Sequence, residues 1–207
     1  MQTTAQARDE MVRQLRADGI TDERVLEAMA EIPREHFLSP ELESHAYADT
    51  PLDIGRGQTI STPWIVAFST SALQVSADST VLEVGTGSGY GAAVLSRCCR
   101  SVITIEREPE LAARARDALS SLGCSNVEVR DGDGTVAGRD AAPYDGILVA
   151  AMATDELPGA LIEQLAPAGT LVCPVGHAGV GDLVRYRDGR SESLEDVGFV
   201  PLVTGQR

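Results

Sequence analysis

The chain has 207 residues, of which 43% are hydrophobic and 23% charged, a composition typical of one globular domain. Its 17 Lys and Arg face 31 Asp and Glu, so the formal net charge is -14 at pH 7. An acidic surface repels phosphate backbones, and neither a signal peptide nor an apolar run of ~18 residues is present, so we expect a cytoplasmic protein without nucleic-acid or membrane partners.

The first part of the chain is expected to be mostly helical. Apolar spacing predicts one helix over Asp9 to Ala17 and a second from the N-cap Thr21 to Ile32, and we expect both to cap one edge of a sheet. The segment from Leu38 to Pro63 is rich in proline and glycine and reads as a long, ordered loop, which is usually a functional feature. A helix over Ile65 to Leu73 follows it.

From residue 80 onward, short apolar strands alternate with helices. The expected strands are Thr80 to Val84, Val102 to Glu106, Val127 to Arg130, Gly146 to Ala150 and Leu171 to Val175, and the expected helices are Tyr90 to Arg97, Pro109 to Leu122 and Pro158 to Leu165. This alternation predicts an α/β fold with a doubly wound, mostly parallel sheet. Asp182 to Tyr186 and Val197 to Val203 are expected to finish the sheet as an antiparallel pair. We therefore divide the chain into an N-terminal helical extension (1–73) and a core (74–207) within a single globular unit.

A glycine-rich loop follows the first strand of this core. Glu83 is the second-last residue of the strand, and Gly85, Gly87 and Gly89 alternate with small polar residues before the next helix. Such a loop turns tightly and lets a ligand approach the backbone at the carboxyl end of a parallel strand. The pattern predicts a nucleotide-like cofactor, either a dinucleotide or S-adenosylmethionine.

Two further acidic strand ends bear on the choice of cofactor. Glu106 ends the second strand, where both classes of protein place a carboxylate on ribose hydroxyls, so it does not discriminate between them. Asp133, with Gly134, follows the third strand, where a carboxylate can accept a hydrogen bond from the adenine amino group. This third acidic loop favours S-adenosylmethionine over a nicotinamide dinucleotide.

The sequence contains no pattern that is typical of a metal site. Four cysteines and three histidines lack the spacing of metal ligands, namely Cys98, Cys99, Cys124, Cys173, His36, His45 and His177. We expect no metal, and we expect the cysteines to be small structural residues.

A second motif, from Ile54 to Ser61, precedes the core. Together with the glycine loop and the segment Gly132 to Gly134, this motif resembles the protein-L-isoaspartate (D-aspartate) O-methyltransferases, and the resemblance runs from about Met11 to Leu202. The resemblance implies an enzyme that methylates the α-carboxylate of L-isoaspartyl residues with S-adenosylmethionine, releasing S-adenosylhomocysteine. The ester then closes to a succinimide, and its hydrolysis partly restores aspartate, so a damaged protein is repaired.

The same resemblance assigns the site residues. It implies a catalytic role for Ser61, substrate contacts for Thr59, Ile60 and Ser61, and cofactor contacts for Ile54, Gly55, Arg56, Gly57, Glu83, Gly85, Gly87, Glu106, Asp133 and Gly134. The alternative for Ser61 is a plain N-cap of the helix that follows. Two other functions stay open, a methyltransferase that modifies a normal aspartate in one dedicated peptide and an adenosyl-binding protein without turnover. We favour a monomer that repairs isoaspartyl proteins.

Overall fold

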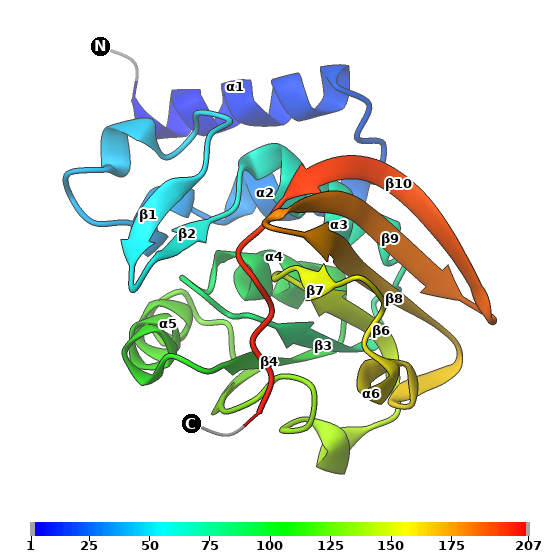
Figure 1. Ribbon diagram of the computed structural model, residues 1–207. Coiled ribbons are helices and arrows are strands. Elements are labelled where there is room, and N and C mark those ends of the chain that lie inside the picture. The colour runs from blue at the N-terminus through cyan, green and yellow to red at the C-terminus, as the bar shows by residue number, and fades with distance from the viewer. Residues whose placement is uncertain (1–2, 206–207) are drawn as a thin grey trace.

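The computed structural model describes residues 3–205. Its elements follow one another as α1 (Thr4–Ala17), α2 (Glu23–Glu31), η1 (Arg34–Phe37), η2 (Glu43–His45), β1 (Leu52–Gly55), β2 (Gln58–Ile60), α3 (Pro63–Ala72), β3 (Thr80–Val84), α4 (Tyr90–Cys98), β4 (Ser101–Glu106), α5 (Pro109–Ser121), β5 (Val127–Asp131), η3 (Arg139–Ala141), β6 (Tyr144–Val149), β7 (Ala153–Thr154), α6 (Gly159–Ile162), β8 (Leu165–His177), β9 (Val180–Arg187) and β10 (Arg190–Gly198). Figure 1 shows these elements stacked in layers around one sheet.

The sheet has the strand order β10-β9-β8-β6-β3-β4-β5, with β7 added beside β8. Strands β3, β4, β5, β6 and β8 run parallel, whereas β9 and β10 are antiparallel to their neighbours. The sheet is therefore mostly parallel, as the alternation of strands and helices predicts, and its antiparallel end is built from the C-terminal third of the chain.

Alternate side chains of the strands supply two separate cores. Val81 of β3 and Val102 of β4 face the side covered by α3, α4 and α5. Leu82 of β3 and Ile103 of β4 face the other side, where the short helix α6 and the segment near η3 cover the sheet. Burial on both faces explains why these strands read as continuous apolar runs in the sequence.

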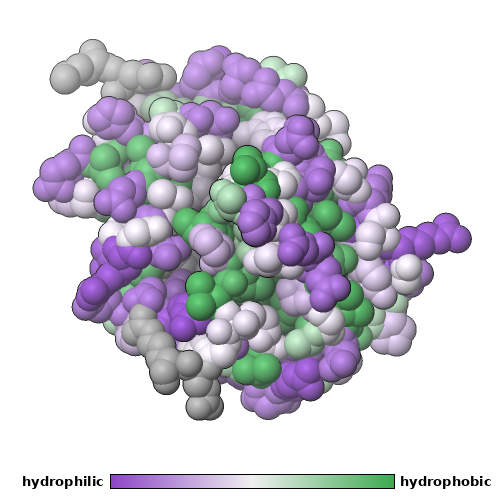
Figure 2. Space-filling model, viewed as in Figure 1, coloured by the Kyte–Doolittle hydropathy of each residue, from purple (hydrophilic) through white to green (hydrophobic). Residues whose placement is uncertain are grey.

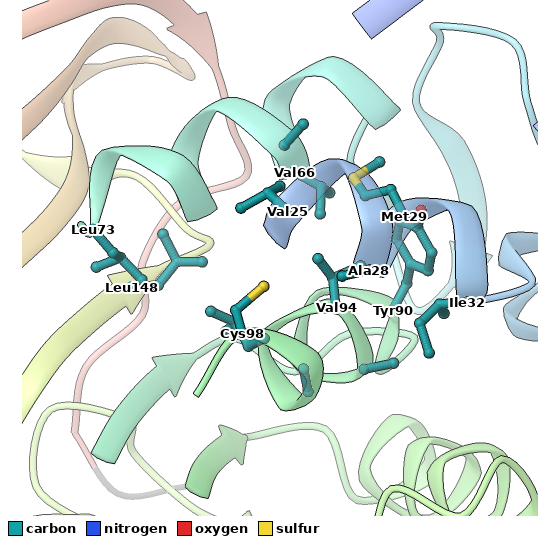
Figure 3. Close-up of a cluster of buried hydrophobic side chains, with 14 of the residues drawn as sticks. Val25, Ala28, Met29, Ile32, Val66, Leu73, Tyr90, Val94, Cys98 and Leu148 are labelled. Atoms are coloured by element: carbon teal, nitrogen blue, oxygen red, sulfur yellow. The ribbon is translucent and has the colours of Figure 1, made fainter. Parts of the chain in front are cut away.

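The N-terminal helices form an extra layer and do not cap a sheet edge, so that expectation is wrong. Helix α2 packs on α4 through Val25, Ala28, Met29 and Ile32, which meet Val94 and Cys98 as well as Val66 of α3 (Figure 3). The reason is that α2 has a broad apolar face, whereas the edge strand β10 is polar and exposed and needs no helical cover.

Several predicted boundaries are also corrected. Helix α1 begins at Thr4, because Thr3 and Gln6 form a capping box, and Asp22 rather than Thr21 caps α2. The segment read as a long loop contains the hairpin β1–β2, whose turn at Arg56 and Gly57 has positive φ at both residues.

The C-terminal part of the chain differs most from the prediction. Strand β10 ends at Gly198, and the expected strand over Val197 to Val203 is wrong for most of its length. Sequence reasoning missed β10 because its residues from Arg190 to Asp196 are almost all polar and exposed, as suits an edge strand. Residues 199–203 instead cross to Met152, whose N–H donates to the Val200 carbonyl at 2.7 Å and whose carbonyl accepts from Leu202 N–H at 2.7 Å.

None of the helices between residues 3 and 205 is long and apolar enough to cross a membrane.

Candidate active site

A cleft opens at the carboxyl ends of β3, β4 and β6. Its walls are the glycine loop, the segment between β2 and α3, and the C-terminal segment 199–203. Apolar residues gather in the middle of the face drawn in Figure 2, surrounded by polar surface. The cleft lies where doubly wound proteins bind their ligands.

The glycine loop forms the floor of this cleft. Gly85, Gly87 and Gly89 have φ values of 97°, 54° and 94°, which only glycine adopts without strain. The N–H groups of Gly85 and Thr86 donate to the Ile105 carbonyl at 2.9 and 3.3 Å, so the loop is fixed to the neighbouring strand. Gly89 is the N-cap of α4. The backbone conformation that the glycine pattern predicts is therefore the one that the structure has.

Glu83 is buried at the centre of the sheet beside the cleft. The parallel register of β3 and β4 places it opposite Thr104, whose hydroxyl donates to Glu83 Oε2 at 2.6 Å. Burial raises the pKa of Glu83 to about 8, because desolvation and the nearby Glu106 together outweigh the hydrogen bond from Thr104. Glu83 thus gives the cleft a buried carboxyl group that its surroundings favour in the protonated form.

Glu106 holds the glycine loop as well as lining the cleft. Its Oε2 accepts from the N–H of Gly87 at 2.8 Å, and its Oε1 accepts from the N–H of Glu108 at 2.9 Å. The side chain is only 6% exposed, so these two bonds fix its orientation. Each carboxylate oxygen has a further lone pair, which leaves Glu106 able to accept from a ligand hydroxyl.

Asp133 lies at the edge of the cleft, while its neighbours Gly132 and Gly134 line it. Its Oδ1 accepts from the N–H and hydroxyl of Thr135 at 2.9 and 2.7 Å, and its Oδ2 accepts from Gly205 N–H at 2.6 Å. Burial alone would raise the pKa of Asp133, but these bonds and Arg107 hold it below its usual value. Asp133 is an ionised acceptor that already holds the C-terminal segment.

The hairpin β1–β2 lies over the glycine loop. Ile54 reaches over Gly87, since a Cβ built on that glycine would be 3.5 Å from Ile54 Cδ1. The turn residues Gly55, Arg56 and Gly57 do not line the cleft, and the Arg56 side chain pairs with Glu110 of α5. Of the four hairpin residues assigned to the cofactor, only Ile54 thus closely approaches the glycine loop.

Ser61 stands at the cleft, next to Thr59 and Ile60, which also line it. The structure gives the capping role to the next residue, because the Thr62 hydroxyl accepts from Ile65 N–H at 3.3 Å and Pro63 begins α3. Ser61 is therefore not the N-cap, and its hydroxyl is not engaged in capping α3.

Sequence reasoning missed several residues of the cleft. Tyr90 and Ser69 line it from α4 and α3, and the segment 199–203 closes one wall. The Arg107 side chain donates to the Val203 carbonyl at 2.7 Å and so helps to hold that wall. These residues carry no local motif, because tertiary packing alone brings them to the cleft.

This combination of sheet order, glycine loop and acidic strand ends defines the fold of S-adenosylmethionine-dependent methyltransferases. A structure from Plasmodium falciparum, assigned to the protein-L-isoaspartate O-methyltransferases and solved with S-adenosylhomocysteine, is similar with a TM-score of 0.81 at 25% identity, covering 95% of this chain and 98% of that one.

Sequence relatives narrow the class to a family. The family model of protein-L-isoaspartate(D-aspartate) O-methyltransferase matches residues 6–207. A protein-L-isoaspartate O-methyltransferase of Methanoregula boonei is 52% identical over 92% of this chain and 89% of the relative. That of Halorhodospira halophila is 49% identical over 99% of this chain and 94% of the relative. The chain belongs to the protein-L-isoaspartate (D-aspartate) O-methyltransferase family.

Proposed function

We propose that this protein transfers a methyl group from S-adenosylmethionine to the α-carboxylate of L-isoaspartyl residues in damaged proteins. The observation that carries the proposal is that one cleft brings together the glycine loop, the acidic strand ends and the residues Thr59 to Ser61, which we call the Ser61 segment. Membership of the family supports the same reaction.

The residues of the cleft fit an adenosyl methyl donor. Glu106 would accept from ribose hydroxyls, the glycine loop would pack against the amino-acid end, and Asp133 would accept from the adenine amino group beside Gly205. Tyr90 adds a buried hydroxyl that has no partner among the described residues. When bound, S-adenosylmethionine supplies a methyl group on positively charged sulfur.

The reaction requires positioning more than proton transfer. An α-carboxyl group has a reference pKa of roughly 3.5, so the acceptor is already ionised at pH 7 and needs no general base. A C–O bond forms as the C–S bond breaks, and the two opposite charges disappear without any proton moving. Ser61 would donate to one carboxylate oxygen and leave the other free to face the methyl group. Ile60, Ile65 and Leu148 line the cleft with apolar surface that excludes water.

The proposal also assigns roles to the two parts of the chain. Residues 1–73 carry the Ser61 segment, frame the substrate and cover the glycine loop with Ile54, and residues 74–207 bind the methyl donor. The net charge of -14 favours a monomer and disfavours nucleic acid as a substrate. We propose that this monomer acts on proteins in the cytoplasm.

The decisive experiment compares two peptides that differ only in an L-isoaspartyl or a normal aspartyl linkage. Base-labile methyl ester is counted after incubation with labelled S-adenosylmethionine, and S-adenosylhomocysteine binding is measured by calorimetry. We expect methylation of the isoaspartyl peptide only and one adenosyl site per chain. Methylation of the aspartyl twin would indicate dedicated modification, and binding without ester formation would indicate a non-catalytic adenosyl-binding protein.

A further inference from the structure

Arg34 is the largest fully buried side chain in the described chain, with an exposed fraction of 0%. Arginine is almost never buried to this extent unless it is paired, because taking a cation out of water is costly. Its partners are two carbonyl groups, since Nε donates to Ala46 O at 2.7 Å and Nη2 donates to Ser61 O at 2.7 Å. The third nitrogen, Nη1, has no partner among the described residues.

The guanidinium also lies on the ring of Tyr90. Its central carbon is 4.9 Å from the ring centroid, a distance typical of a cation–π contact. Tyr90 is the first residue of α4 and lines the cleft behind the glycine loop. Arg34 thus joins the N-terminal extension, the Ser61 segment and the core at one buried point.

These contacts act on the segment that carries the proposed catalytic serine. The Ser61 carbonyl accepts a hydrogen bond from the Arg34 guanidinium, and the next residue, Thr62, caps α3. With its carbonyl fixed and the following residue committed to the helix, the Ser61 backbone has little freedom to rotate. The Cα–Cβ bond of Ser61, which lines the cleft, is held in place as a consequence.

We infer that Arg34 is a positioning residue, whose guanidinium fork holds the Ser61 segment against Tyr90 and so orients the serine hydroxyl toward the acceptor carboxylate. This inference rests on the proposed function and adds a residue to it. This positioning role requires an arginine. A lysine would keep the charge, but its single ammonium group could not reproduce the planar fork of donors.

The test uses the variants Arg34→Lys and Arg34→Met, with Arg97→Met as the matched control. Arg97 also ties the core to the N-terminal extension, through Glu31 of α2 at 2.8 Å, but it does not line the cleft. For Arg34→Lys we expect turnover of the isoaspartyl peptide to fall roughly tenfold or more, because misplacement of a reacting group is costly in rate. Affinity for S-adenosylhomocysteine should stay within about threefold, and Arg97→Met should keep turnover within about twofold.

Trp64, the sole tryptophan, provides a second measurement that does not depend on activity. Its backbone N–H donates to Asp49 Oδ1 at 3.0 Å, and its ring stacks on Phe68 with centroids 4.6 Å apart. Its fluorescence therefore reports on the segment after Ser61. We expect acrylamide to quench Trp64 more strongly in Arg34→Lys than in the wild type or in Arg97→Met, while the circular dichroism spectrum is unchanged.

The outcomes separate the inference from the proposed function. Wild-type turnover and quenching in Arg34→Lys would overturn the inference, and so would an equal loss of turnover and of S-adenosylhomocysteine affinity. If Arg34→Met does not fold, Arg34→Lys carries the test alone. A wild-type protein that methylates no isoaspartyl peptide would refute the proposed function, and the quenching of Trp64 would still show whether Arg34 holds the segment.

Discussion

At the scale of single residues, Ser61 and Thr62 have different roles, one facing the cleft and the other capping α3, which the sequence does not distinguish. Either could cap α3, because both side chains carry a hydroxyl and both precede Pro63. The structure assigns capping to Thr62, whose hydroxyl accepts from Ile65 N–H at 3.3 Å. Ser61 is left to face the cleft.

This division predicts opposite effects for two neighbouring substitutions. Ser61→Ala should lower turnover on the order of 10²-fold, because a donor that orients the acceptor is lost, while the free energy of unfolding is nearly unchanged. Thr62→Ala should keep turnover within a few-fold but lower the free energy of unfolding by about 1 kcal/mol, because the cap is lost. Steady-state kinetics and urea denaturation of both variants test this. Full activity of Ser61→Ala would reduce Ser61 to a framing residue.

At the scale of elements, the hairpin β1–β2 is attached to the core through α5. The Arg114 side chain donates to the Ile54 carbonyl, and Arg56 pairs with Glu110. Because Ile54 reaches over Gly87, this attachment keeps the hairpin closed over the glycine loop.

The attachment predicts that Arg114→Met weakens S-adenosylhomocysteine binding by roughly three- to tenfold, since loss of one hydrogen bond is worth about 0.5–1.5 kcal/mol. The matched control is Arg116→Met on the same helix, because Arg116 donates to the Val129 carbonyl of β5 at 3.1 Å and does not reach the hairpin. Calorimetry on both variants measures the difference. Equal affinities in the two variants would show that the hairpin does not depend on Arg114.

At the scale of the whole molecule, a carboxyl buried at the centre of the sheet links stability to pH. The pKa of Glu83 rises from its unfolded value near 4.5 to about 8 in the fold, so the folded state binds this proton more tightly than the unfolded state. Its contribution to stability is fully present below pH 4.5 and is lost as the pH rises toward 8.

The wild-type protein should therefore lose stability through Glu83 between about pH 5 and 8, on top of the effects of its other carboxylates. In Glu83→Gln, which keeps an acceptor for Thr104 and cannot ionise, this part of the slope should vanish, and the variant should gain on the wild type as the pH rises. Urea denaturation from pH 5 to 8.5 measures both slopes. Parallel slopes in the two proteins would show that Glu83 does not change its protonation on folding.

Local sequence determines much of this protein. The alternation of strands and helices, the glycine loop and the acidic strand ends are short patterns that can be read from neighbouring residues, and the structure has each of them. The buried strands are readable because both of their faces need apolar residues. The Ser61 segment can likewise be recognised as a motif, although the residues that contact it cannot be predicted from the sequence.

What only the tertiary structure decides are the contacts between segments that are distant in sequence. Arg34 meets Ser61 across 27 positions, and Gly205 meets Asp133 across 72, with no local pattern to mark either pair. Most of strand β10 and the wall formed by residues 199–203 also escape prediction from sequence, since a polar edge strand and an irregular segment have no period of their own. Sequence patterns record local conformation, whereas the partner of a side chain depends on how the whole chain packs.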